Sequence, residues 1–212
     1  MSFYATRSYL MAKTYDAIMR STERRCLADW RREILADARG ELLEIGAGTG
    51  LNLPFYSEQT NHIILSEPDA QMRRQLERKV KRHPRRRIDI IPSSAEQIDL
   101  PDASIDGVVS TLVLCSVACP TASLQEISRL LRPGGTLHFM EHIVSDRPHI
   151  RRWQQRLQPL WSFCAGDCQL SRNTAVTIRD AGLHIEWVTE DAMCGAPAFV
   201  NRTIRGVARK PL

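Results

Sequence analysis

The segment Glu41–Gly50, with the sequence ELLEIGAGTG, has the residue types that a cofactor-binding turn requires. Its apolar first half predicts a short β-strand, which runs directly into the three alternating glycines Gly46, Gly48 and Gly50. Glycine adopts positive φ angles and allows a ligand to approach the backbone closely. Open α/β sheets bind ligands beyond the carboxyl ends of their strands, so this turn is placed where a ligand would bind.

A carboxylate follows the turn at a distance that suits ribose recognition. Glu67 comes seventeen residues after Gly50 and ends the second predicted strand, where its oxygens could accept hydrogen bonds from ribose hydroxyls. No Gly-Lys-Ser/Thr follows the glycines, which excludes a phosphate-binding P-loop. A dinucleotide-binding fold is an alternative, although its third glycine would fall where Leu51 stands.

Alternating strands and helices must position this turn, and the sequence predicts both. Apolar runs predict strands at 41–45, 62–66, 87–91, 105–114 and 136–143, and later at 183–190 and 203–209. Helical patterns are expected at 8–38, 51–56, 68–82, 120–131 and 150–164, and at 171–181 with Ser171 as its cap. This order predicts an α/β fold with a mostly parallel sheet. The last two strands have no helix between them, which predicts an antiparallel pair.

With these motifs the sequence resembles the class I S-adenosylmethionine-dependent methyltransferases from about residue 40 to residue 209. Ser94-Ala95-Glu96, Asp102–Asp106 and Leu130–Gly135 (LLRPGG) stand in the order that the family shows. The resemblance implies a Rossmann-like seven-stranded, mostly parallel sheet with the last strand antiparallel, helices on both faces and an N-terminal helical lid. We expect one domain over 1–212, with the lid at 1–38 and the core at 39–212.

The resemblance also implies the cofactor, S-adenosyl-L-methionine, with S-adenosyl-L-homocysteine as its product, and the residues that bind it. Family roles carried onto matching positions place Pro68, Ala95 and Glu96 at the adenine, Glu67 at the ribose and the backbone of Leu112 beside the cofactor. The methionine part is expected against Glu44, Gly46, Ala47, Gly48 and Gly50. Of the lid tyrosines Tyr4, Tyr9 and Tyr15, one is expected at the carboxylate, and Tyr15 is our assignment; a packing role for these rings is the alternative.

Three short segments narrow the resemblance. Ser110–Val117, Phe139–His142 and Gly166–Arg172 look like segments of the methyltransferase-like seven proteins, which are thiol S-methyltransferases of animals. Those proteins begin with a membrane-anchoring apolar segment, which is not found in this sequence. We therefore expect methyl transfer to a small-molecule acceptor, preferably a thiol. N-methylation of a phospholipid headgroup and C- or O-methylation of a quinone-like ring are alternatives.

Six residues near the ends of later strands and loops are candidates for work on the acceptor. Because the sulfonium of the cofactor is already a good leaving group, the enzyme must mainly position a nucleophile. A thiol, with a pKa near ~8.5, needs modest help to ionise. The candidate catalytic residues are His142 and Asp167, and the candidate acceptor-binding residues are Cys115, Glu141, Trp161 and Cys168. For each, a purely structural role is the alternative.

Composition and charge constrain the partners and the compartment. The 212 residues carry a net charge of +5, yet residues 71–87 alone hold nine Lys or Arg against Glu77. This segment could bind nucleic acid, but it lacks interleaved aromatic residues and should lie away from the crevice, so we expect at most weak docking on anionic surfaces. The six cysteines lack metal-site spacing, and no metal is expected. No apolar run is long enough for a membrane span, which favours a cytoplasmic protein.

Overall fold

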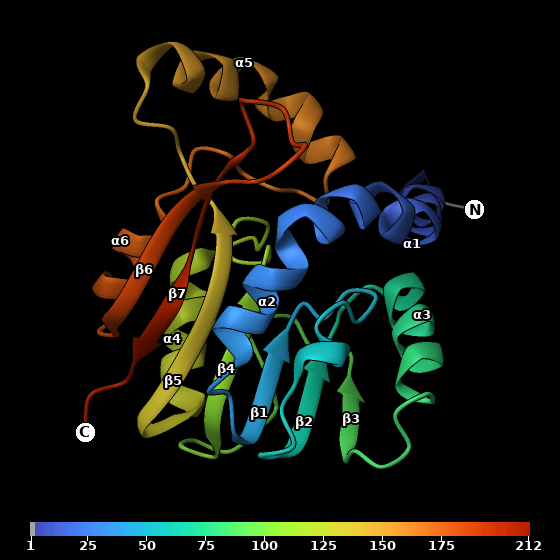
Figure 1. Cartoon of the computed structure of the whole chain (residues 1–212), viewed down its shortest axis with the longest axis vertical. Helices are drawn as coiled ribbons and strands as arrows, with labels where there is room; N and C mark the ends of the chain where they lie inside the picture. Colours follow the sequence, from blue (N-terminus) through green and yellow to red (C-terminus); the bar gives the residue numbers. More distant parts are fainter. Residues whose placement is uncertain (1–2) are drawn as a thin grey trace.

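The computed structural model describes residues 3–212, with side chains described from residue 5 onward. A seven-stranded sheet with the order β3-β2-β1-β4-β5-β7-β6 forms its centre (Figure 1). The strands are β1 (Gly40–Ile45), β2 (Thr60–Ser66), β3 (Ile88–Ile91), β4 (Ile105–Thr111), β5 (Leu131–His142), β6 (His184–Ala192) and β7 (Arg202–Arg209). Neighbouring strands among β3, β2, β1, β4 and β5 pair in parallel, and β7 is antiparallel to both β5 and β6. The expected Rossmann-like sheet with an antiparallel last strand is thus confirmed.

Helices cover both faces of the sheet and bury two separate apolar clusters. On one face, α2 (Ala28–Leu35) and α3 (Ala70–Val80) contribute Ile34, Leu35 and Leu76 to the core. On the other face, α4 (Pro120–Leu130) and α6 (Thr174–Asp180) contribute buried aliphatic side chains to the second cluster. Apolar burial of this kind is the main favourable term in folding. The sheet is therefore held rigid between the two layers, and the carboxyl ends of its parallel strands form one edge.

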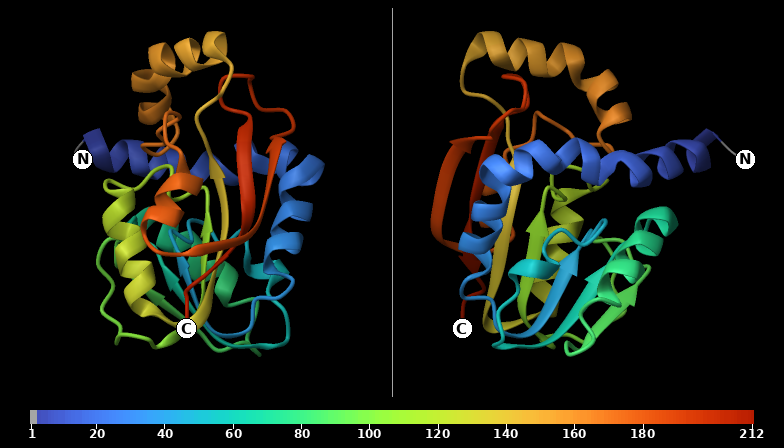
Figure 2. Two further views of the ribbon diagram at one scale, coloured as in Figure 1. Left: turned by 90° about the vertical axis from the view of Figure 1, so that its left-hand side faces the viewer. Right: turned by 45° about the vertical axis from the view of Figure 1, so that its right-hand side comes forward.

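Two long helices lie above that edge rather than against a face of the sheet. Figure 2 shows α1 (Phe3–Thr22) crossing above the strand ends, with α5 (Pro148–Cys164) above it. The single helix expected at 8–38 is instead α1, a five-residue π-helix η1 (Glu23–Leu27) and α2. Because the π-helix bends the chain, α2 packs on the sheet while α1 extends over the crevice. Among the described residues, no helix has the length and apolar character needed to cross a membrane.

Two local expectations are corrected. The helix expected from Ser171 begins at Thr174, and its cap is Asn173, whose side chain accepts a hydrogen bond from the Val176 amide. The preceding residues are engaged elsewhere, because the Arg172 guanidinium donates to carbonyls of the loop after β4. The segment expected to form a helix at 51–56 is only a short 3-10 helix, η2 (Leu53–Phe55), which contains a proline.

The turn after β1 is packed against the core at its last glycine. Gly50 has a φ of +82°, and a Cβ built there would lie 2.7 Å from Leu76 Cδ1 and 2.8 Å from Leu53 Cδ1. Gly182, after α6, has a similar φ of +80° but no atom within 4 Å of such a Cβ. The two glycines therefore share a backbone requirement and differ in packing.

We expect Gly50→Ala to destabilise the fold more than the matched variant Gly182→Ala. The positive φ should cost both variants roughly 1–2 kcal/mol. Overpacking against Leu53 and Leu76 should add about 1–3 kcal/mol for Gly50→Ala alone. Urea unfolding of both variants measures the difference in free energy of unfolding. Equal losses would contradict the packing argument.

Candidate functional site

The middle glycine of the turn faces open space. Gly46 and Gly50 are packed against protein atoms, whereas the nearest atom to a Cβ built on Gly48 is the Gly46 carbonyl oxygen at 3.9 Å. The turn is fixed to the end of β2, since the Ala47 amide donates to the Ser66 carbonyl at 2.9 Å. This leaves a backbone surface that a ligand can approach and that a side chain would occupy. The residues present thus fit the cofactor that the sequence implies.

Glu67 lies directly against this turn, so the two expected cofactor elements meet in space. Its Oε2 accepts from the Gly48 amide at 2.7 Å, and its Oε1 accepts from the Asp69 amide at 2.8 Å. Burial raises the pKa of Glu67, whereas these amide hydrogen bonds favour its ionised form. The carboxylate therefore supports the shape of the turn, and its contact with a ribose stays a prediction.

A buried polar network lies beneath the turn. The sequence analysis named only one of its residues, Glu44. Glu44 accepts hydrogen bonds from Asn52 Nδ2 at 2.9 Å and from the Tyr56 hydroxyl at 2.6 Å. Burial raises the pKa of Glu44 to about 7. The Glu44 carboxylate thus holds η2 under the glycines. Its direct contact with the methionine part of the cofactor stays a prediction.

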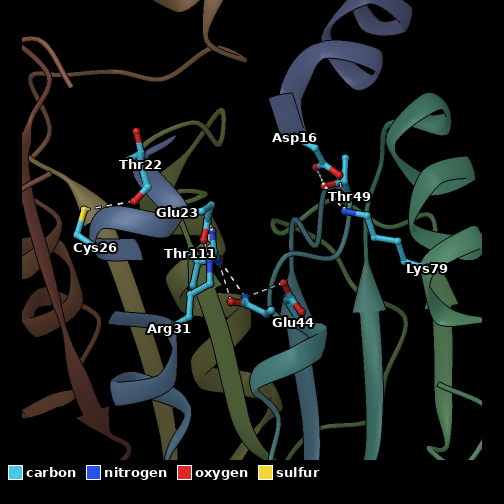
Figure 3. A network of polar contacts seen from close by, with 10 residues as sticks. Asp16, Thr22, Glu23, Cys26, Arg31, Glu44, Thr49, Lys79 and Thr111 are labelled. Carbon is cyan, nitrogen blue, oxygen red and sulfur yellow. Dashed lines mark hydrogen bonds and ion pairs between the residues drawn. The ribbon is translucent and has the colours of Figure 1, made fainter. Parts of the chain in front are cut away.

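Arg31 joins this network to the N-terminal helices (Figure 3). Its Nη1 donates to Asn52 Oδ1 at 2.7 Å and to Thr111 Oγ1 at 3.0 Å, and its Nη2 forms an ion pair with Glu23 at 2.8 Å. The guanidinium is almost fully buried. Its position four residues after Leu27 on the apolar face of the helix was a signal in the sequence, since a charge there must be paired.

The helix α1 is held over the crevice by polar contacts on both sides. Asp16 accepts a hydrogen bond from the Thr49 hydroxyl and pairs with Lys79 at 2.6 Å (Figure 3). At its other side, Arg7 pairs with Asp167 at 2.9 Å. These contacts join α1 to the glycine turn, to α3 and to the loop after α5. This placement agrees with the expected lid, whose movement stays a prediction.

Of the three lid tyrosines, Tyr15 lies closest to the expected role. Burial raises the pKa of Tyr15 to about 12, and Arg31, Glu23 and Cys115 act on it electrostatically. Tyr9 is exposed, with the Lys13 ammonium 4.7 Å from its ring centroid. The side chain of Tyr4 lies outside those that the structure describes. The ring of Tyr15 thus faces the buried network, and its contact with a carboxylate stays a prediction.

The end of β4 has an unusual backbone. Leu112 has a φ of +61°, a conformation that costs a non-glycine residue about 1–3 kcal/mol and is found mainly at functional sites. Its amide donates to the Met140 carbonyl at 2.7 Å. This geometry suits the backbone contact with the cofactor that we expected of Leu112.

Glu141 lies beneath the loop after β4. Its Oε1 accepts from the Ser110 hydroxyl at 2.7 Å and the Val113 amide at 3.1 Å, and its Oε2 accepts from the Cys115 amide at 3.0 Å. The side chain is fully enclosed, and burial raises its pKa. Glu141 thus positions Cys115 and its loop, and its direct contact with an acceptor stays a prediction.

The remaining expected adenine contacts lie at the edge of the same loop. Glu96 Oε1 accepts from the Ala118 amide at 3.0 Å and the Cys119 amide at 3.3 Å, while Ala95 is buried in the core. Pro68 is exposed at the start of α3, and its carbonyl accepts from Arg73. Their contacts with an adenine stay predictions.

Three of the four expected acceptor-binding residues meet above the strand ends. Cys115 and Cys168 have their Sγ atoms 3.6 Å apart, and Trp161 packs partly buried in the same apolar cluster. The Trp161 ring stands edge-on to Phe199, with centroids 5.5 Å apart. Among the described residues, its indole nitrogen is buried and has no hydrogen-bond partner. The cluster offers apolar surface and two thiols, and the Trp161 indole acts on the Cys168 sulfur, whose pKa it lowers.

The two expected catalytic residues do not have the properties of a general base. Asp167 is exposed, with a φ of +64°, and pairs with Arg7 at the outer rim. His142 is buried, and burial lowers its pKa to about 4. A base works best with a pKa near the operating pH, so this environment favours a neutral buried ring, and the catalytic role expected of His142 stays a prediction.

Lowering the pH should reduce the stability of the fold because His142 is buried in its neutral form. Its folded pKa of about 4 lies below the value near 6.5 expected in the unfolded chain, so the unfolded state binds more protons between these pH values. The stability of the wild type should therefore fall, relative to that of His142→Gln, by up to roughly 3 kcal/mol as the pH falls from 6.5 to 4. Urea unfolding across this range tests the difference. Parallel stability curves would contradict it.

Comparison with known proteins agrees with this geometry. Residues 43–139 match the family described as a methyltransferase domain. The chain is 36% identical over 152 residues to a protein of Rattus norvegicus named thiol S-methyltransferase TMT1B, covering 69% of this chain and 62% of that protein. It is 31% identical to thiol S-methyltransferase TMT1A of Homo sapiens, covering 76% of this chain and 66% of that protein. The chain thus spans less than two thirds of the length of these relatives.

A solved structure shows the same fold. The S-adenosylmethionine-dependent methyltransferase from Thermotoga maritima superposes with a TM-score of 0.66 at 19% identity, covering 96% of this chain and 99% of that one. The glycine turn and its partner acid thus lie at the strand ends of a fold that this solved structure shares. The match to the methyltransferase domain and the relatives named methyltransferases identify the chain as a member of the methyltransferases.

Proposed function

We propose that this chain transfers the methyl group of S-adenosylmethionine to the thiol of a small, largely apolar molecule. The observation that carries the proposal is the identity with relatives named thiol S-methyltransferases over more than two thirds of the chain. The acceptor side supports it, because the cluster around Trp161 and Phe199 offers apolar surface. A cytoplasmic location is part of the same proposal.

The cofactor would be held by groups that the fold keeps in place before binding. The open backbone at Gly48, the Glu67 carboxylate and the backbone of Leu112 line the carboxyl ends of three adjacent strands. Bound there, S-adenosylmethionine supplies a methyl group on a sulfonium that is already a good leaving group. The protein then has to position the acceptor and exclude competing water, and α1 lies where it can cover both.

The acceptor thiol should lose its proton to solvent, without a base from the enzyme. Among the acceptor-side candidates, His142 has a pKa of about 4, and Asp167 is exposed at the rim. A small thiol with a pKa near ~8.5 is already a few per cent thiolate at neutral pH, and the thiolate is the nucleophile. The enzyme therefore needs only to bind and position the fraction of the acceptor that is already thiolate.

The pH dependence of methyl transfer should consequently follow the acceptor and not the enzyme. We expect the rate to rise with pH to a midpoint near the thiol pKa, and an aryl thiol to reach its midpoint at lower pH than an alkyl thiol. Formation of S-adenosylhomocysteine with both acceptors measures the two profiles. A midpoint shared by both acceptors would show an enzyme base. Product from amines or phenols, but never from thiols, would overturn the thiol assignment.

Gly48→Ala should separate cofactor binding from folding. Its added methyl group meets no protein atom closer than 3.9 Å, so it would occupy the space proposed for the cofactor. We expect the affinity for S-adenosylmethionine, measured by calorimetry, to fall at least about tenfold, equivalent to roughly 1.4 kcal/mol. Its stability should resemble that of Gly182→Ala. Unchanged affinity in a folded Gly48→Ala protein would argue against this cofactor position.

The basic segment 71–87 adds only weak docking on anionic surfaces to this proposal. Four of its cations are engaged within the protein: Arg73 with backbone carbonyls, Arg74 with Gln71, Lys79 with Asp16, and Arg86 with the segment before β2. The exposed remainder lies along α3 and the turn that follows it, leading away from the glycine turn (Figure 1). We do not expect this surface to select the acceptor.

A further inference from the structure

Cys115 and Cys168 form a close thiol pair at the acceptor side. Cys115 lies in the loop after β4 and Cys168 in the loop after α5, and their Sγ atoms are 3.6 Å apart. Their relative exposures are 1% and 4%, so both are enclosed. Cys119 and Cys164, by contrast, are exposed thiols. The molecule thus contains both a buried pair and matched exposed controls.

The backbone around the pair already has the closeness that a disulfide requires. The amide of Gln169, next to Cys168, donates to the Cys115 carbonyl at 2.7 Å. Arg172 clamps the same two loops, donating to the carbonyls of Leu114 and Val117 at 2.7 Å each. A disulfide bond is ~2.05 Å long, so the sulfurs must approach by about 1.5 Å, which takes side-chain rotation together with a small shift of the two loops.

The two sulfurs are chemically unequal. The contact with the Cys115 thiol lowers the pKa of Cys168, and Arg172 acts in the same direction. The contact with Cys168 and burial together raise the pKa of Cys115. The two thiols also differ in access. Cys168 is the more exposed of the two and follows the exposed Asp167 directly, so a disulfide from solvent reaches Cys168 first and Cys115 second.

We propose that Cys115 and Cys168 are a thiol–disulfide exchange site for low-molecular-weight disulfides, and that closing the pair stops methyl transfer. The Cys168 thiolate attacks one sulfur of the small disulfide, forming a mixed disulfide and releasing one thiolate. Cys115 then loses its proton and attacks Cys168 Sγ, which breaks the mixed bond and releases the second thiolate. The protein pair gives up two electrons and two protons, and the small disulfide becomes two thiols.

Closure should affect methyl transfer because the pair lies beside the backbone proposed to contact the cofactor. Cys115 follows Leu112, with its φ of +61°, by three residues, and its amide is anchored to the buried Glu141. Drawing the Cys115 sulfur toward the other loop moves this anchored segment. A misplacement of about 1 Å at a reacting centre can cost a hundredfold in rate.

The helix α1 controls access to the pair. Met11 lies against Gly166, two residues before Cys168, and Arg7 pairs with Asp167. The side chains of that ion pair are 23% and 66% exposed, and exposed pairs contribute little to stability. The cover can therefore open without loss of the core, and Figure 2 shows α1 lying beneath α5.

The test uses the full chain treated with oxidised glutathione, alkylated with iodoacetamide and analysed by peptide mass spectrometry. We expect a peptide linked through Cys115 and Cys168, a fall in methyl transfer of about a hundredfold, and recovery with dithiothreitol. The double variant Cys119→Ser/Cys164→Ser should keep the wild-type rate and close in the same way. Cys168→Ser should form no such link, and its own rate should not respond to oxidised glutathione.

Three results would overturn the proposal: glutathione on Cys119 and Cys164 without the Cys115–Cys168 link, a Cys26–Cys194 link in its place, or closure without a change in rate. Arg7→Gln, which leaves the core untouched, should speed closure by up to about fivefold. The disulfide is detected by mass spectrometry without any methyl acceptor. The rate is measured with any acceptor that the enzyme methylates. Failure of this inference is therefore distinguishable from failure of the thiol acceptor.

Discussion

The buried guanidinium of Arg31 is the constraint on which the site depends. A charge taken out of water must be paired and fully hydrogen-bonded, and removing one partner of such a group typically costs about 3–5 kcal/mol. Arg31 meets this requirement with Glu23 from η1, Asn52 from the segment after the glycine turn and Thr111 from the end of β4. One side chain thereby fixes the lid connection, the turn and a central strand relative to one another.

This constraint explains why the surrounding acids differ in role. Glu23 is consumed in pairing Arg31, and Glu44 accepts from Asn52 and Tyr56 in the same enclosed space. Glu67, on the neighbouring strand, accepts only backbone amides of the turn and the α3 start. Preorganised polar groups of this kind cost no rearrangement when a ligand arrives, which is how rigid sites achieve positioning.

The sequence predicted the features that are local in the chain. Glycine spacing, the acid at the end of β2 and the succession of strands along the chain are properties of short segments, and the structure places them as expected. The antiparallel end of the sheet followed from the absence of a helix between two late strands. The resemblance to a family implied the same number of strands that the apolar runs predicted.

Contacts between distant segments could not be predicted in the same way. Glu141 and His142 end a functional strand, yet their burial depends on the loop after β4 and on residues near β7. Cys115 and Cys168 were named as separate candidates, because their spacing along the chain says nothing of a 3.6 Å approach. The break between α1 and α2 was hidden because a π-turn keeps helical periodicity almost intact.

That π-helix also makes the length of the N-terminal segment a fixed quantity. Each residue of an α-helix turns the chain by about 100°, so losing one residue between α1 and α2 would rotate α1 about its axis by that angle. Asp16 would leave Thr49 and Lys79, and Tyr15 would turn away from the buried network. The rotation of α1 about its axis is thus set by the number of residues between α1 and α2. Substitutions in η1 should therefore be tolerated far better than insertions or deletions.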